Sequence, residues 1–215
     1  MAITLTLSSH PPPSLSSLLL NPLHLVSRRS SYSYKRRQPQ IQQKPTSPLF
    51  ITRAMRAVVQ RVTSATVEVE GRIVSEIGPG LLVFIGILES DCDSDSNYIC
   101  RKVLNMRLFP NENTGKAWDQ SVVQKSYEVL LVSQFTLYGT LKGNKPDFHV
   151  AMPPQRAKPF YESLVEKFGK SYNPTLIKDG VFGAMMKVNL VNDGPVTLQL
   201  ESPQTSKSEN DTEQP

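Results

Sequence analysis

Two long apolar runs constrain most strongly what this chain can fold into. Residues 81–87 consist of Leu, Val, Phe, Ile and a single Gly, and residues 127–137 form a second apolar run that passes into polar side chains near its end. Runs of this length, bounded by turn residues, are typical of strands that are buried on both faces. We therefore expect both runs to lie at the centre of a β-sheet.

Shorter segments around these runs complete the predicted fold. Ala65, Val67 and Val69 alternate with polar residues, as in a strand with one buried face. Acids cap a helix expected over residues 95–108, and a second helix follows Pro153 and Pro154. Further strands are expected over residues 55–62, 63–70, 73–77, 181–184, 186–191 and 196–200. The chain is thus predicted to be an α+β protein, a single domain with a mainly antiparallel, barrel-like sheet and two principal helices.

The two ends of the chain differ in composition from the middle. Residues 1–54 contain seven basic residues and no acid, with many Ser and Pro, which is typical of an organelle-targeting leader. A basic segment that binds nucleic acid is the alternative. Residues 201–215 carry four acids against one Lys and nothing apolar to bury, so we expect a disordered acidic tail. The domain is expected over residues 55–200, and Met55 is a candidate internal start that would give a cytoplasmic form.

Composition excludes several kinds of site in this domain. Its net charge is only +1, so the basic pI of the whole chain belongs to the leader. Cys92, Cys100 and His149 are its only Cys and His residues, too few to complete a four-ligand zinc site. No apolar run reaches the length of a membrane span. We expect no metal, no cofactor and no membrane partner.

Two polar segments remain as candidates for chemistry. Ser133, Gln134, Phe135 and Thr136 end a predicted buried strand, where Ser and Thr often only satisfy backbone groups. Asn192, Asp193, Gly194 and Pro195 read equally well as a turn between two strands. A cis bond costs far less before proline than elsewhere, and Gly194, the residue before Pro195, has more backbone freedom than other residues. This dipeptide is therefore able to orient its two backbone carbonyls in ways that ordinary backbone cannot.

Taken together, these segments resemble one family. Residues 55–62, 80–83, 131–137, 142–146 and 191–197 occur in the order and spacing found in D-aminoacyl-tRNA deacylases, over about residues 55–200. One departure is Lys145-Pro146-Asp147-Phe148, where the family commonly has Arg-Pro-Ser-Phe. The loss of a planar guanidinium and the gain of an acid change the contacts that we expect at that loop.

The resemblance implies a homodimer that hydrolyses the ester between a D-amino acid, and in many members glycine, and the 3′ end of tRNA. It implies a site at the dimer interface, where Ser133, Gln134, Phe135 and Thr136 of one subunit face a Gly-cisPro pair, Gly194 and Pro195, of the other. Asn192 and Thr197 flank that pair as further substrate-binding residues. Rigid carbonyls there would exclude an L side chain by shape and so proofread chirality in translation.

The roles of single side chains stay open. Thr136 is either the nucleophile of an acyl-enzyme or a neighbour of backbone N–H groups that stabilise the oxyanion while the tRNA 2′-hydroxyl assists. Phe135 is either part of a pocket for the terminal adenosine or a core residue. Lys142, Lys145 and Arg156 are candidates for phosphate contacts. Rival hypotheses are a non-catalytic nucleic-acid-binding dimer and a general esterase that uses His149.

Overall fold

The computed structural model describes residues 54–203. The predicted leader and most of the predicted tail lie outside these residues. The folded part is slightly longer at both ends than the sequence suggested. Ala54 and Ser202 are buried, and Glu201 still belongs to the last strand, because the backbone of Met55 pairs with that of Ser202.

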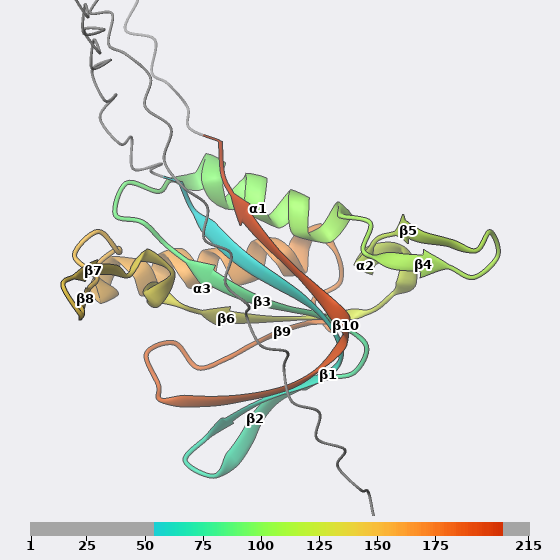
Figure 1. Cartoon of the computed structure of the whole chain (residues 1–215), viewed down its shortest axis with the longest axis horizontal. Helices are drawn as coiled ribbons and strands as arrows, with labels where there is room; N and C mark the ends of the chain where they lie inside the picture. Colours follow the sequence, from blue (N-terminus) through green and yellow to red (C-terminus); the bar gives the residue numbers. More distant parts are fainter. Residues whose placement is uncertain (1–53, 204–215) are drawn as a thin grey trace, which may run out of the picture. The chain divides into compact units, whose positions relative to one another are not determined.

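A mixed sheet organises the fold in the order β10-β1-β3-β6-β9, with β2 paired to β1 (Figure 1). β1 is antiparallel to β10, β2 and β3, whereas β3, β6 and β9 run parallel. The strands are β1 (Arg56–Val69), β2 (Arg72–Ile77), β3 (Gly80–Gly86), β6 (Glu128–Ser133), β9 (Ile177–Asp179) and β10 (Met186–Glu201). The predicted α+β class with a mainly antiparallel sheet is confirmed.

Helices α1 (Asp93–Asn105) and α3 (Pro154–Ser171) are the two principal helices, as predicted. The short helices are α2 (Val122–Lys125) and the 3-10 helix η1 (Phe135–Tyr138), and two hairpins are formed by β4 (Phe109–Asn111) with β5 (Lys116–Gln120) and by β7 (Thr140–Lys142) with β8 (Lys145–Asp147). Figure 1 shows the two hairpins at opposite ends of the sheet.

Both central strands are buried on their two faces, as their apolar sequences predict. On β3, Leu81, Val83 and Ile85 pack with α1 and α3, whereas Leu82 packs into a second cluster with β2 and the first half of β10. β6 alternates in the same way. Each large side chain buried in this manner contributes about 1.5–3 kcal/mol, so these two strands anchor the positions of the segments that follow them.

Three local predictions were wrong. Residues 55–62 and 63–70 form one continuous strand, β1. Residues 181–184 form a turn and not a strand. Asn192–Pro195, expected to be a turn between two strands, lies inside the single long strand β10, which bends sharply there (Figure 1). The bend is a bulge, because four residues of β10, 193–196, lie opposite Arg61 alone. Bulges and turns favour the same residues, so local composition did not separate them.

Among residues 54–203, no helix is both long and apolar enough to cross a membrane.

Candidate functional site

The first candidate segment leaves the sheet directly after β6. Ser133 is paired with Ile85 of β3, and the Gln134 N–H donates to the Ile85 carbonyl at 2.7 Å before η1 begins. A side chain at Gly86 would crowd this crossing, because its Cβ would lie 3.0 Å from Leu137 Cβ and 3.1 Å from the Tyr138 ring. Two buried strands and one glycine therefore determine where η1 lies.

Arg56, which the sequence did not single out, holds the far end of η1. Its guanidinium donates to the Leu137 carbonyl at 2.9 Å and lies 4.8 Å from the centre of the Tyr138 ring. The Tyr138 hydroxyl donates to the Ala54 carbonyl, and burial raises the pKa of this phenol. Arg56 is itself paired with Glu201 at 3.1 Å. Residues from both ends of the folded part thus fix this helix.

The side chains of the segment face outward from this support. Thr136 is exposed, and Phe135 is 58% exposed, which excludes the core role considered for it. The Phe135 ring packs edge-on against Phe148 with 5.0 Å between centres. The Gln134 side-chain amide donates to the Thr136 hydroxyl at 2.6 Å. Ser133 is half-buried behind them. The four predicted residues therefore form one continuous, partly exposed surface.

Backbone donors are also available on this surface. The Gln134 N–H is used by Ile85, and the Leu137 N–H donates to the Gln134 carbonyl at 3.2 Å. The N–H groups of Phe135 and Thr136 open the 3-10 helix and have no acceptor among residues 54–203. Two adjacent free amides beside an exposed hydroxyl are suited to stabilise an oxyanion.

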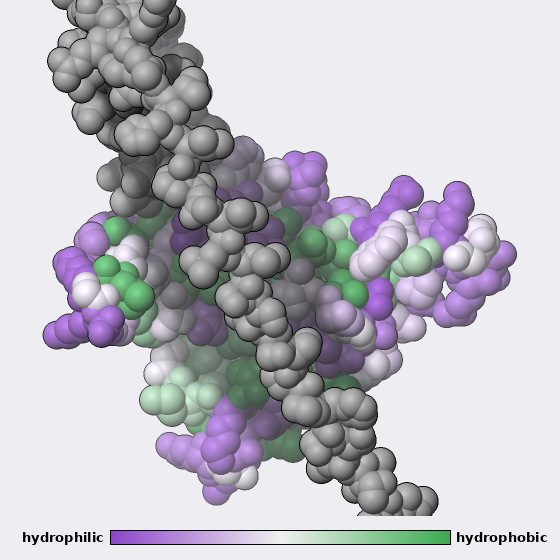
Figure 2. All heavy atoms as spheres, viewed as in Figure 1, coloured by the Kyte–Doolittle hydropathy of each residue, from purple (hydrophilic) through white to green (hydrophobic). Residues whose placement is uncertain are grey.

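The loop that departs from the family pattern lies beside this surface, at the β7–β8 hairpin. Asp147 pairs with Lys142 and with the imidazole of His149 at 3.0 Å. The Lys142 ammonium is the main cause that lowers the pKa of Asp147 to about 2. No hydrogen bond joins His149 to Ser133 or Thr136 in the described part of the chain. Figure 2 shows apolar atoms among charged ones at this end, where Leu141 is 72% exposed.

Of the candidate phosphate contacts, Arg156 is held by Glu89 through an ion pair of 3.4 Å and a bond to its carbonyl. Lys145 is exposed at the hairpin and has no ion pair within residues 54–203. Lys145 is therefore the candidate whose charge is least neutralised.

The second candidate segment is the bulge of β10. Arg61 holds it through a bond to the Asp193 carbonyl at 3.1 Å and an ion pair with the Asp193 carboxylate at 3.0 Å. The same guanidinium donates to the Leu108 carbonyl and lies 5.6 Å from the centre of the Trp118 ring. Gly194 adopts φ +67°, a conformation that favours glycine. Arg61 was not predicted, because an arginine within an apolar strand gave no signal of this role.

The Gly194–Pro195 bond differs from the expectation. The bond is trans, since no cis peptide occurs among residues 54–203, and the Gly-cisPro geometry that the resemblance implies is not seen in this structure. The trans form is the preferred isomer even before proline, by about 0.5–1 kcal/mol, and the strand pairing of β10 resumes directly after the bulge. Asn192, Gly194, Pro195 and Thr197 are nevertheless all exposed at the bulge, and the Gln60 amide donates to Thr197 at 3.5 Å.

The two segments do not meet within one chain. The bulge lies opposite Arg61, which pairs with Leu81, whereas Ser133 pairs with Ile85. Along the strands, the bulge and Ser133 are about 13 Å apart, because Leu81 and Ile85 are four residues of about 3.3 Å apart on β3. Across the sheet, β10 is three strand spacings of about 4.8 Å from β6. Figure 1 shows the bend of β10 at the opposite end of the sheet from η1.

Metal ligands do not gather anywhere in the described part of the chain, where no three His, Cys, Asp or Glu side chains lie close enough to hold an ion. Cys92 is exposed and Cys100 is buried, both as free thiols.

Comparison with known proteins assigns these features to a family. A family model described as D-Tyr-tRNA(Tyr) deacylase matches residues 58–201. The D-aminoacyl-tRNA deacylase of Dictyostelium discoideum is 55% identical over 148 residues, which are 69% of this chain and 98% of that protein. D-aminoacyl-tRNA deacylase 1 of Homo sapiens is 52% identical over 160 residues, 74% of this chain and 76% of that protein.

Solved structures agree in fold. One, described as c-Myc DNA Unwinding Element Binding Protein, is 54% identical, with a TM-score of 0.67 over 69% of this chain and 99% of that one. Another, described as a probable eukaryotic D-amino acid tRNA deacylase, is 17% identical with a TM-score of 0.62 and supports the fold alone. The match of the family model and the identity to these relatives show that this chain belongs to the D-Tyr-tRNA(Tyr) deacylase family.

Proposed function

We propose that this protein hydrolyses the ester bond of D-aminoacyl-tRNA, releasing the free D-amino acid and the tRNA, and that it rejects L-aminoacyl-tRNA. The family and the names of relatives at 50–55% identity support this activity. The observation that carries it is the exposed surface of Ser133, Gln134, Phe135 and Thr136, with its two unpaired amides.

The contacts at Thr136 favour one mechanism. An acyl-enzyme needs a base that removes the Thr136 proton. The group that contacts this hydroxyl is the Gln134 amide, which donates a hydrogen bond and does not titrate near neutral pH. We therefore propose that the Phe135 and Thr136 N–H groups stabilise the developing oxyanion. The tRNA 2′-hydroxyl assists the attack of water on the ester carbonyl. This route needs no acid and base pair from the chain.

Selection of the D isomer is assigned to Gly194 and Pro195. The two stereoisomers carry the same groups, so attraction to the side chain cannot separate them and one must be excluded by shape. Arg61 fixes the backbone of the bulge at Asp193, and the backbone of the exposed residues Gly194 and Pro195 would fill the volume that an L side chain needs. Glycine has no side chain to clash, so glycyl-tRNA should be accepted too.

A second subunit is needed to bring the two segments together. Within one chain they lie at opposite ends of the sheet, so we propose a homodimer in which each bulge faces the Ser133–Thr136 surface of its partner. β10 is the edge strand of the sheet, and Val191 and Leu198 on it are 59% and 40% exposed. A long edge strand with exposed apolar residues is suited to cover by a second copy.

Mixing two inactive variants tests this arrangement. Thr136→Tyr blocks the reaction surface and Pro195→Tyr blocks the bulge, and both positions are exposed, so both variants should fold. In a dimer of one variant with the other, one site has both segments intact, and an equal mixture should recover about a quarter of native activity by random pairing. Recovery no greater than the sum of the separate variants would contradict sites shared between subunits.

We further propose import into a chloroplast or mitochondrion, supported by the seven basic residues and absence of acids in residues 1–54. Initiation at Met55 would instead give a cytoplasmic form. A fluorescent fusion of residues 1–60 tests this, and a purely cytosolic signal would refute import.

The alternative, a non-catalytic nucleic-acid-binding dimer, is supported by the name of one solved relative, c-Myc DNA Unwinding Element Binding Protein. It requires salt-sensitive binding that is lost on deletion of residues 1–54, without ester hydrolysis.

A further inference from the structure

The β4–β5 hairpin carries an aromatic side chain with no role in the site described above. Trp118 is the single tryptophan of the chain, and it is 59% exposed. A lone exposed aromatic residue is common on protein surfaces and is not by itself a site. Trp118 differs because its ring is held by a cation that belongs to the candidate site.

That cation is Arg61. Its guanidinium lies 5.6 Å from the centre of the indole ring, and it also holds the Asp193 carbonyl and carboxylate beside Gly194. The side chain of Arg61 is only 14% exposed, so it is a fixed support. The Arg61 guanidinium thus lies between Trp118 and the bulge at Gly194 and Pro195, to which we assign selection of the D isomer. With one face of the ring toward Arg61 and most of its area exposed, the ring offers an open stacking surface.

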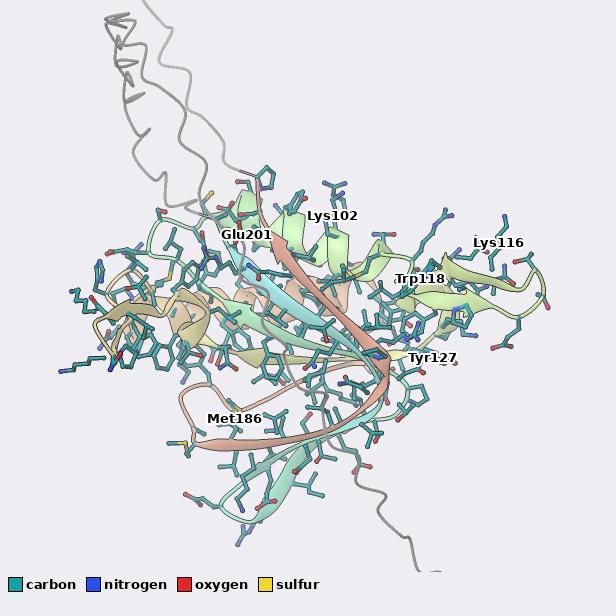
Figure 3. All side chains as sticks on the ribbon, in the orientation of Figure 1. Lys102, Lys116, Trp118, Tyr127, Met186 and Glu201 are labelled. Carbon is teal, nitrogen blue, oxygen red and sulfur yellow. The ribbon has the colours of Figure 1, made fainter. Side chains whose placement is uncertain are left out.

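The surroundings of this ring suit an anionic ligand with a flat base. Lys116 is two residues before Trp118 on β5, so both side chains lie on the same face of the strand, and Figure 3 shows both along the hairpin. Asp119 lies on the other face, where it accepts from Asn111 at 2.7 Å. Arg107, at 3.9 Å from Asp119, is 65% exposed at the base of the hairpin. Arg61 is paired with Asp193, so the cation that this face offers to a ligand is Lys116, which has no ion pair within residues 54–203, while Asp119 is engaged by Asn111 and Arg107.

We propose that Trp118 is a stacking platform for an unpaired nucleobase of the tRNA acceptor end, with Lys116 as its phosphate contact. This inference rests on the proposed function, because the bulge of one subunit must face the reaction surface of the other for Trp118 to lie beside the bound 3′ end. Aromatic side chains bind unpaired bases of any sequence by stacking, and a nearby cation contributes through the backbone phosphates. The platform therefore contributes affinity for the single-stranded end and leaves the ester chemistry unchanged.

The single tryptophan makes the test direct, because all tryptophan fluorescence of the full chain reports on position 118. Titration with intact deacylated tRNA should quench it, whereas the same tRNA without its unpaired 3′ nucleotides should quench it little. Unchanged fluorescence at tRNA concentrations that saturate binding, measured independently by filter retention, would overturn the inference.

Kinetics of variants give a second test. Trp118→Ala should raise KM for D-aminoacyl-tRNA by roughly 5- to 100-fold and leave kcat near the native value, because stacking energy is the same in ground and transition states. Trp118→Phe should restore most of the affinity. Asn113→Ala at the tip of the same hairpin is the matched control and should change neither constant. A fall in kcat with KM unchanged would mean that Trp118 acts only through Arg61 on the bulge, and would overturn the platform.

Two further outcomes separate this inference from others. If Trp118→Ala dissociates the dimer, and if KM becomes native at protein concentrations that restore it, Trp118 is a subunit contact and the inference fails. If the native protein quenches with intact tRNA but deacylates nothing, the proposed function fails and the platform stands. If it deacylates D-aminoacyl-tRNA but its tryptophan fluorescence is not quenched by intact tRNA, the platform fails and the proposed function stands.

Discussion

Replacing Arg61 with alanine should destabilise the fold and impair the reaction together. The guanidinium donates to the carbonyls of Leu108 and Asp193, pairs with the Asp193 carboxylate and lies 5.6 Å from the centre of the Trp118 ring. Leu108 is buried and its bond to Arg61 is partly buried, so its carbonyl would lose its donor at a cost of about 1–3 kcal/mol. The ion pair adds less, because the Asp193 side chain is 45% exposed, and with the lost bond to the Asp193 carbonyl the expected total is about 2–4 kcal/mol.

Urea unfolding of native protein and variant measures the first effect, and steady-state deacylation of D-aminoacyl-tRNA measures the second. Arg61→Lys should retain part of the stability, since it keeps the charge, but it should lose activity because a single ammonium cannot hold both carbonyls. Arg72→Ala is the matched control. This arginine is exposed on β2 without an ion pair in residues 54–203, so its loss should cost less than about 0.5 kcal/mol. An Arg61→Ala variant with near-native stability and kcat/KM would refute the role of Arg61 in holding the bulge of β10.

Three other substitutions give separate readouts. Gly80→Ala should prevent folding or cost several kcal/mol by urea unfolding, because its Cβ would lie 2.0 Å from the Glu128 carbonyl oxygen of the neighbouring strand; a stable variant would mean that this crossing relaxes. Gly194→Ala should cost only about 1–2 kcal/mol, for its positive φ, since the nearest atom is 3.7 Å away. Its D-specific kcat/KM should fall much further than its stability, and equal losses would argue against a filter there. For Asp91, burial raises the carboxyl pKa from 3.8 to about 7, so its neutral form contributes stability that is complete below pH 3.8 and is lost as pH rises through 7. Asp91→Asn should remove this dependence, a relative change of up to about 4 kcal/mol between pH 4 and pH 8, and parallel stability curves would contradict it.

The sequence predicted those parts of the fold that depend on local pattern. The runs that became β3 and β6 were recognisable because their central side chains are apolar on both faces. The stripe of α3, with Tyr161, Leu164 and Phe168 buried, was recognisable from its helical spacing. Asn192–Pro195 was misread because its residues suit both a turn and a bulge, and only the pairing with β1, more than 120 residues away, decides between them.

The candidate site was predictable only in part, for the same reason. Ser133–Thr136 and Gly194–Pro195 were found through their joint occurrence in a family, and the structure places each on an exposed surface. Arg56 and Arg61 are charges on a strand whose partners are distant carbonyls, so spacing along β1 carried no information about them. The close packing at Gly86 likewise arises only because η1 crosses this residue.

The most direct test of the proposed activity is a comparison of deacylation rates on matched D- and L-aminoacyl-tRNA by the full chain. We predict rapid release of the D-amino acid and, above the spontaneous rate, almost none of the L-amino acid. Equal rates on the two stereoisomers, or no hydrolysis of either, would contradict chiral proofreading by this protein.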